Sequence, residues 1–165
     1  MAEYTAVALQ TVEENQSIYF TDAVICGNNS ITHRNGSGLV TLRGITCQCR
    51  ARFKVSFGGN IAIPTGGTVE AISLAIAING EPVQSTLMIE TPAAVEEFSN
   101  VFSAIFIDVP AGCCVQVSVK NTSTQAIDVQ NANLIVERVA WEDRYGRTIK
   151  TNENEFSELC SSTNG

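Results

Sequence analysis

The sequence predicts an all-β protein, an antiparallel β-sandwich of the jelly-roll type with a C-terminal extension. Three observations support this fold class. Short segments alternate apolar and polar residues with a period of two, turn-forming residues separate them, and no segment before residue 140 has a helical period. With 165 residues, 44% of them hydrophobic, the chain is long enough to bury one core. Regularly spaced short strands, about nine here, are typical of sandwiches and jelly rolls.

Individual strands follow from the alternating side chains. In residues 52–57, 71–78 and 115–120, β-branched or aromatic residues alternate with small or polar ones. The segment Val101–Val109 is apolar at both sets of alternate positions, so we expect a strand that is covered on both faces within an assembly. Turn-forming residues bound these segments at Asn35-Gly36, Gly58-Gly59, Pro64–Gly67, Asn79-Gly80 and Pro110–Gly112.

The chain divides into a β-sandwich domain, residues 1–140, and a C-terminal arm, residues 141–165. Hydrophobic alternation stops near residue 140, and charged residues become more frequent after it. A frayed tail is the ordinary explanation of a charged terminus. The alternative is an arm that anchors to a neighbouring subunit or partner, because bulky apolar side chains are favoured at interfaces. The anchors would be Trp141, Tyr145, Ile149, Phe156 and Leu159.

Charge and hydropathy exclude several classes of partner. The net charge of −7 disfavours binding to nucleic acid and to anionic membranes. Aromatic residues make up only 7% of the chain and do not cluster with Lys or Arg. The longest mainly apolar stretch, residues 71–78, is too short to span a bilayer. The first residues lack a secretory pattern, so we expect synthesis in a cytoplasm.

Catalytic residues are scarce, and we expect neither an enzyme nor a bound metal or cofactor. His33 is the only histidine, which excludes a multi-histidine metal site, and we expect it at the surface or on a strand edge. Phosphate-binding, dinucleotide, zincin and hydrolase motifs are absent from the sequence. Glu96 and Glu97 are adjacent carboxylates of the sandwich. As neighbours on a strand they would point to opposite faces rather than share a site.

Six cysteines stand out: Cys26, Cys47, Cys49, Cys113, Cys114 and Cys160. Their spacings are CxC and CC rather than the CxxC knuckle of structural zinc sites, so a four-sulfur site remains geometrically open but is not indicated. We expect buried free thiols first, and disulfides formed after release second. Cys160, in the arm, is the candidate for an intersubunit disulfide. The sequons at Asn28, Asn35 and Asn121 indicate turns.

The order of strands and turns resembles a known family. Two segments carry the resemblance: a strand ending in Asn79-Gly80 before Glu81-Pro82-Val83, and the turn Val109–Gly112 that leads into a next-to-last strand. In this respect the chain resembles the tumour-necrosis-factor-like and complement-type globular jelly roll over residues 31–140. Cys113 stands where that family often has an acidic residue, and no collagen-like stalk precedes the domain. The resemblance implies a homotrimer.

Overall character and the phrases VTLRGITCQCRA and NANLIVERVA also resemble small structural proteins of phages and prophages. Two features agree with a trimer: the small residues Ala71, Ser73, Ala75 and Ala77, which permit close sheet packing, and the surplus apolar surface of 101–109. The alternative is that a single monomer core absorbs this surface.

Our first hypothesis is therefore a non-enzymatic virion structural protein, a trimer that decorates and cements a capsid. Its partner would be the major capsid protein or a neighbouring virion protein, and its location the capsid surface after synthesis in the host cytoplasm. The alternative is a receptor- or glycan-binding head of a phage fibre or tail. Such a head would use the Asn-, Ser- and Thr-rich loops 28–38 and 121–125.

Overall fold

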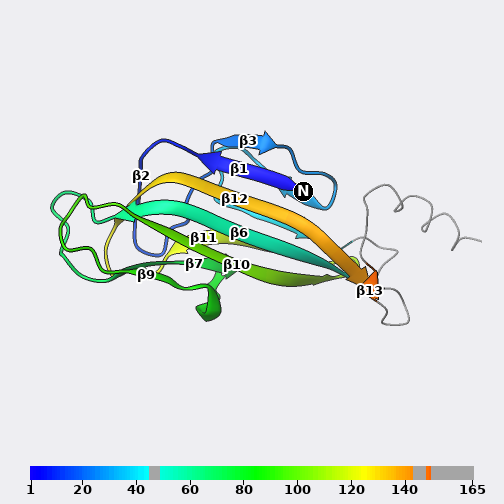
Figure 1. Cartoon of the computed structure of the whole chain (residues 1–165). Coiled ribbons are helices and arrows are strands. Elements are labelled where there is room, and N and C mark those ends of the chain that lie inside the picture. Colours follow the sequence, from blue (N-terminus) through cyan, green and yellow to red (C-terminus); the bar gives the residue numbers. More distant parts are fainter. Residues whose placement is uncertain (45–48, 143–147, 150–165) are drawn as a thin grey trace, which may run out of the picture.

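The computed structural model describes residues 1–44, 49–142 and 148–149. They form two packed antiparallel sheets, as the fold class predicts (Figure 1). These residues hold thirteen strands and one three-residue 3-10 helix. The sequence indicated fewer strands because several have only two or three residues, too few for an alternating pattern. Within the described ranges, no helix is long and apolar enough to cross a membrane.

The elements follow one another in short steps along the chain. Their bounds are β1 (Ala2–Ala6), β2 (Gln10–Val12), β3 (Asp22–Ile25), β4 (Ile31–His33), β5 (Val40–Arg43), β6 (Arg50–Ala62), β7 (Ile72–Ile78), β8 (Glu81–Pro82), η1 (Gln84–Thr86), β9 (Met88–Glu90), β10 (Ser99–Pro110), β11 (Cys114–Asn121), β12 (Ile127–Glu142) and β13 (Thr148–Ile149).

Strand order identifies the jelly roll. One sheet, called the large sheet here, has the order β10-β6-β12-β1-β3, and β2 and β13 also pair with β12. The other, the small sheet, has the order β4-β5-β11-β7-β8, and β9 also pairs with β7. Strands from both ends of the sequence, β1 and β12, lie side by side in the large sheet (Figure 1). Such long-range neighbours distinguish a jelly roll from a simple up-and-down meander.

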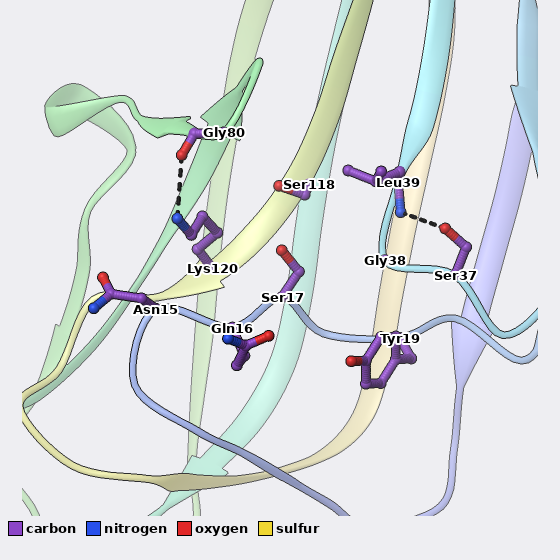
Figure 2. A pocket seen from close by; sticks show the side chains of 10 residues that line it. All are labelled: Asn15, Gln16, Ser17, Tyr19, Ser37, Gly38, Leu39, Gly80, Ser118 and Lys120. Atoms are coloured by element: carbon purple, nitrogen blue, oxygen red, sulfur yellow. Dashed lines mark hydrogen bonds between the residues drawn. The ribbon is translucent and has the colours of Figure 1, made fainter.

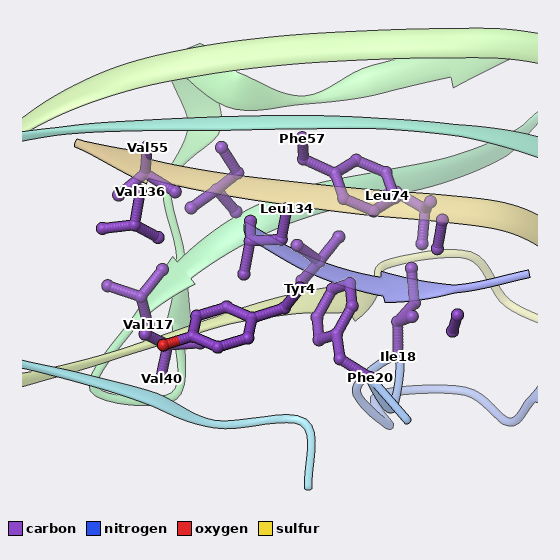
Figure 3. Close-up of a cluster of buried hydrophobic side chains, with 14 of the residues drawn as sticks. Tyr4, Ile18, Phe20, Val40, Val55, Phe57, Leu74, Val117, Leu134 and Val136 are labelled. Atoms are coloured by element: carbon purple, nitrogen blue, oxygen red, sulfur yellow. The ribbon is translucent and has the colours of Figure 1, made fainter. Parts of the chain in front are cut away.

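One hydrophobic core lies between the two sheets. The inward positions of β6 are fully buried at Phe53, Val55 and Phe57. They belong to one cluster with Leu74 of β7 and Val117 of β11 in the opposite sheet, and Figure 3 shows Val55 and Phe57 on the side of β6 that faces these residues. The predicted alternation is therefore confirmed in β6. In β7 and β11 the predicted inward residues Leu74 and Val117 are buried, but residues of the other face, among them Ala75 and Ser118, are buried as well. Burial of one such side chain contributes about 1.5–3 kcal/mol, which makes this core the main source of stability.

The C-terminal boundary remains a prediction. Strand β12 continues two residues past position 140, to Glu142, and Trp141 pairs with Ile149 of β13 in the backbone register. The other predicted anchors and the cysteine of the arm, namely Tyr145, Phe156, Leu159 and Cys160, lie outside the described residues.

Candidate interaction surfaces

The outer face of the large sheet exposes two aromatic rings on its edge strand. In β10, Val101, Ile107 and Val109 point into the core, whereas Phe102 and Phe106 are 66% and 62% exposed. The two-faced apolar strand expected from the sequence is therefore present, and no part of the chain that the structure describes covers Phe102 and Phe106 on its outer face. Isolated exposed apolar residues are ordinary, but two large rings four positions apart on one strand form a patch.

Neighbouring positions leave the Phe102 ring open on the side of β6. Phe102 stands beside Gly58 in the register, and a Cβ at Gly58 would lie 3.7 Å from Cδ2 of the ring. Ala104 stands beside Ser56. Because these neighbours are small, the Phe102 ring protrudes from a shallow surface that another protein can contact closely, whereas Phe106 stands beside Lys54.

Strand β10 is also an edge in the hydrogen-bonding sense. Among the described residues its ladder is made with β6 alone. At the opposite edge of the same sheet, β3 exposes Val24 (63%) and Ile25. The large sheet thus carries different apolar groups on its two edges. Long edge strands with exposed apolar residues are natural sites of association.

An ion pair lies near the C-terminal end of β10. Arg52 of β6 donates from Nε and Nη2 to the two carboxylate oxygens of Asp108, at 2.7 and 2.8 Å. Arg50 Nη1 lies 3.4 Å from Oδ2 of the same carboxylate. The hydrogen bond from Arg52 lowers the pKa of Asp108 below its ordinary value. Because these groups remain partly exposed, the pair contributes to orientation more than to stability.

The small-residue face does not form the second contact surface expected from the sequence. Ala75 and Ala77 are fully buried within a single chain. Lys120 stands beside Ala75 and extends to the Gly80 carbonyl, and β8 flanks Ala77. Ser73 Oγ is hydrogen-bonded to Thr122 Oγ1 at 2.7 Å. The prediction that Ala75 and Ala77 permit close packing of another subunit was therefore wrong, because both are buried within one chain, whereas Ala71 is exposed.

A groove lined mainly by residues with polar side chains lies over the outer face of β11 (Figure 2). Its volume is about 370 Å³. Ser118 and Lys120 of β11 line it, together with the loop before β3, the loop before β5 and the turn after β7. The other lining residues are Asn15, Gln16, Ser17, Tyr19, Ser37, Gly38, Leu39 and Gly80.

Sequence reasoning found only part of this groove. Ser37 and Gly38 belong to the loop 28–38 proposed for glycan binding, but residues 121–125 are not among those that line it. Asn121 is instead fully buried, and its Nδ2 donates to the carbonyls of Val12 and Gln125 at 2.9 and 2.8 Å. In the sequence, Tyr19 was the residue that could have indicated the groove, because it is an aromatic residue in a polar segment. That the loop 15–19 lies along β11 is a long-range pairing, which a local pattern does not indicate.

His33 has a structural position. It ends β4, the edge strand of the small sheet, as expected. Nδ1 lies 3.0 Å from the Leu39 carbonyl and Nε2 lies 3.2 Å from that of Phe20. Its ring centroid is 4.5 Å from that of Tyr4. Both nitrogens are directed at main-chain carbonyls, and a neutral ring, which has one N–H, donates to one of the two. His33 therefore has a structural position between β4 and two neighbouring segments.

Glu96 and Glu97 do not lie on a strand, as the sequence analysis assumed, but in the loop between β9 and β10. Glu96 Oε1 accepts a hydrogen bond from Thr65 Oγ1 at 2.6 Å, whereas Glu97 Oε2 accepts from the backbone amide of Ala93 at 3.1 Å. The sequence analysis expected the two carboxylates to be kept apart because they would point to opposite faces of a strand, and that reason was wrong. Their different hydrogen-bond partners nevertheless give them separate structural roles.

The described cysteines are free thiols at the surface. Cys26, Cys49, Cys113 and Cys114 are all exposed, so the expectation of buried thiols was wrong for these four. They fall at strand ends and in turns, where few neighbours are available to cover them. Over 1–44, 49–142 and 148–149, no group of three or more His, Cys, Asp or Glu side chains is arranged to hold a metal. Cys47 lies outside these residues.

Two solved structures are similar to this fold. The globular domain of the zebrafish complement 1qA protein superposes with a TM-score of 0.52 at 11% identity, covering 81% of this chain and 94% of that one. Murine APRIL, determined at pH 5.0, gives a TM-score of 0.53 at 9% identity, with coverages of 81% and 97%. No family model matches the sequence, and no curated protein matches it. At these identities the likeness is one of fold: the chain is an all-β jelly roll similar to the tumour-necrosis-factor and complement globular domains.

Proposed function

We propose that the protein is a non-enzymatic virion structural protein, a homotrimer that decorates and cements a capsid surface. The observation that carries this proposal is the pair of exposed rings, Phe102 and Phe106, on the edge of the large sheet. The two similar structures support a binding or structural domain rather than an enzyme. The histidine and the paired carboxylates have structural partners, which agrees with that view.

The asymmetry of the large sheet supports assembly into a ring such as the proposed trimer. Phe102 and Phe106 lie at one edge, and Val24 lies at the other. An interface between two different patches is heterologous, and a heterologous contact closes into a ring when its rotation permits. The edge of one copy packs against the large sheet of the next. Each ring that becomes fully buried contributes about 1.5–3 kcal/mol, before the entropic cost of association.

Attachment to the shell is assigned to the C-terminal arm. The five proposed anchors, from Trp141 to Leu159, would bind the major capsid protein or a neighbouring virion protein. Three arms on one trimer bind together with an avidity that a single arm lacks. The capsid surface, reached after synthesis in the host cytoplasm, is the proposed location.

The test is co-sedimentation of the purified chain with undecorated particles of the phage that encodes it. A variant that ends at Ile149 retains β12 and β13 but lacks residues 150–165. We expect the full chain to bind in multiples of three and the shortened chain to remain trimeric but not to bind. The shortened variant lacks two of the five proposed anchors, Phe156 and Leu159, and binding that survives the truncation would exclude residues 150–165 from attachment. A full chain that does not bind would overturn capsid decoration.

The second candidate function, a glycan-binding head on a fibre or tail, is favoured by one specific observation. The groove over β11 combines an exposed tyrosine with amide and hydroxyl side chains.

A further inference from the structure

We propose that the groove over β11 binds a short carbohydrate that carries a carboxylate. This inference deepens the second candidate function and does not rest on the homotrimer, since one chain supplies the whole groove. Its volume of about 370 Å³ lies within the range of small-molecule sites, roughly 300–1,000 Å³.

The floor of the groove contains the hydroxyl of Ser118. This residue is only 2% exposed and lines the groove, and among the described residues its side chain makes no hydrogen bond. Its oxygen does not belong to the fully buried side-chain atoms that lack a partner, so it remains accessible from the groove. A ligand hydroxyl above β11 can replace the water that bonds it.

The wall beside Ser118 presents further free polar groups. The side-chain amides of Asn15 and Gln16 and the hydroxyl of Ser17 also make no hydrogen bond within the part of the chain that the structure describes. Amides and hydroxyls both donate and accept, as do the hydroxyl groups of a sugar. A purely anionic or purely cationic ligand would leave half of these groups unpaired.

An aromatic ring completes the wall. Tyr19 is 52% exposed, and its ring lines the groove. Gln10 holds its backbone on both sides: Oε1 accepts from the Tyr19 amide at 2.9 Å, and Nε2 donates to the Tyr19 carbonyl at 3.0 Å. A tyrosine offers an apolar face and a polar tip at low entropic cost, which suits the C–H face and hydroxyls of a sugar.

A single cation gives the groove its preference for acidic sugars. Lys120 Nζ donates to the Gly80 carbonyl at 3.2 Å, which uses one of its three hydrogens. No Asp or Glu is among the residues that line the groove. The net charge of −7 on the whole chain is screened over about 8 Å at physiological salt, so Lys120 dominates locally. A ligand carboxylate can accept the remaining hydrogens of its ammonium group.

The groove is preformed because backbone hydrogen bonds fix its wall. Ile18 N donates to the Val119 carbonyl at 2.9 Å, and Asn121 N donates to the Gln16 carbonyl at 2.9 Å. Phe20 N donates to the Ser37 carbonyl at 3.1 Å and joins the two loops. Binding to a preformed site avoids the cost of ordering the loop.

The experiment is calorimetric titration of the full chain with two matched pairs of ligands: 3′-sialyllactose against lactose, and trigalacturonate against galactotriose. We expect at least one acidic member to bind, and to bind about tenfold more tightly than its neutral counterpart, since a hydrogen bond to a charged group is lost in the neutral sugar. Failure of both acidic ligands to bind, or equal binding within each pair, would overturn the proposal.

Variants locate the site. Lys120→Met keeps the aliphatic stem and should weaken the acidic ligand about tenfold while leaving its neutral counterpart unchanged. Ser118→Ala and Tyr19→Ala should weaken both members of a pair. The matched control is Arg43→Gln, which removes an exposed cation of β5 outside the groove. Melting temperatures identify any variant that fails to fold. An effect of Arg43→Gln equal to that of Lys120→Met would indicate only general charge attraction and would contradict the site.

A variant that is a monomer distinguishes a failure of this proposal from a failure of the proposed homotrimer. A variant with both Phe102 and Phe106 changed to Ser should lose the trimer and still bind the acidic sugar. Loss of binding together with loss of the trimer, in a folded variant, would contradict a groove built by one chain.

Discussion

The outward faces of β10 and β11 differ although both strands have the same alternating pattern inside. β10 places Val101, Ile107 and Val109 in the core and exposes two phenylalanines. β11 places Val117 and Val119 in the core and directs Ser118 and Lys120 into a polar groove. The inward residues define the shared fold, whereas the outward residues define what each sheet contacts. One face is suited to another copy of the chain, and the other to a small polar ligand.

The largest expected effect follows removal of the two exposed rings on β10. The double variant Phe102→Ser and Phe106→Ser removes two interface anchors from every subunit contact, at about 2 kcal/mol or more for each anchor. We expect the trimer to dissociate at micromolar concentration while the far-ultraviolet circular dichroism remains unchanged. Sedimentation velocity measures the effect.

Ile89→Ser is the matched control for that variant. Ile89 is as exposed as the two rings but lies on β9 of the small sheet. It should leave the trimer intact. Dissociation of the control, or a trimer that survives the double substitution, would place the interface elsewhere.

The next largest effect concerns Asn121 at the end of β11, which links the small sheet to β2 of the large sheet. Asn121→Ala removes a buried amide that accepts from Ser123 N and donates to Val12 and Gln125. It leaves buried polar groups unpaired, so we expect a loss of about 3 kcal/mol in the free energy of unfolding. Chemical denaturation measures this loss. An unchanged denaturation midpoint would mean that water replaces the amide at no cost.

A smaller effect, an increase in the free energy of unfolding, is expected for a substitution in the core between the two sheets. The hydroxyl of Tyr4 is buried without a hydrogen-bond partner among the described residues. Removal of this orphan in Tyr4→Phe should raise the free energy of unfolding by about 1 kcal/mol. A loss of stability would show that the hydroxyl has a partner in solution.

The same tyrosine makes stability depend on pH. Burial raises the pKa of Tyr4, with a further contribution from the nearby Cys26. The unfolded chain therefore ionises first, and the wild type should lose stability as the pH rises above about 10, toward the raised pKa of the folded state. Tyr4→Phe should show a smaller loss over that interval in denaturation experiments at graded pH.

The smallest effect concerns the end of the β10 surface. Asp108→Asn should cost less than about 1 kcal/mol near neutral pH, because the ion pair with Arg52 is partly exposed. The hydrogen bond from Arg52 lowers the Asp108 pKa, so its stabilisation is present above the unfolded pKa and is lost as the pH falls below about 4. The variant should therefore show a flatter acid limb in denaturation. A limb as steep as that of the wild type would assign the acid sensitivity to other carboxylates.

The sequence predicted the sandwich because its longest strands carry the signal themselves. Phe53, Val55 and Phe57 are inward at every second position, and no tertiary context is needed to see this. The two-faced character of 101–109 was equally local. The covered face of Ala75 and Ala77 was not predictable, since the segments that bury it pair through turns and long-range contacts.

The groove also depends on long-range contacts that a local sequence pattern does not predict. Tyr19 and Ser118 are separated by almost a hundred positions in the sequence, and they meet because backbone hydrogen bonds lay residues 15–20 along β11. Residues 121–125 had the composition of a binding loop, but Asn121 and Ser123 serve as internal hydrogen-bond partners. Composition indicated a polar loop in both places, and only the pairing of strands decided which side chains face solvent.

The most direct test of the central claim is the native mass of the purified full chain, measured by multi-angle light scattering in the presence of reductant. Reductant removes any disulfide through the exposed cysteines as the cause of association. The account predicts a mass three times the 17.7 kDa of one chain, and a single-chain mass for the double phenylalanine variant. A wild-type mass of one chain, unchanged with concentration, would contradict assembly through the large sheet.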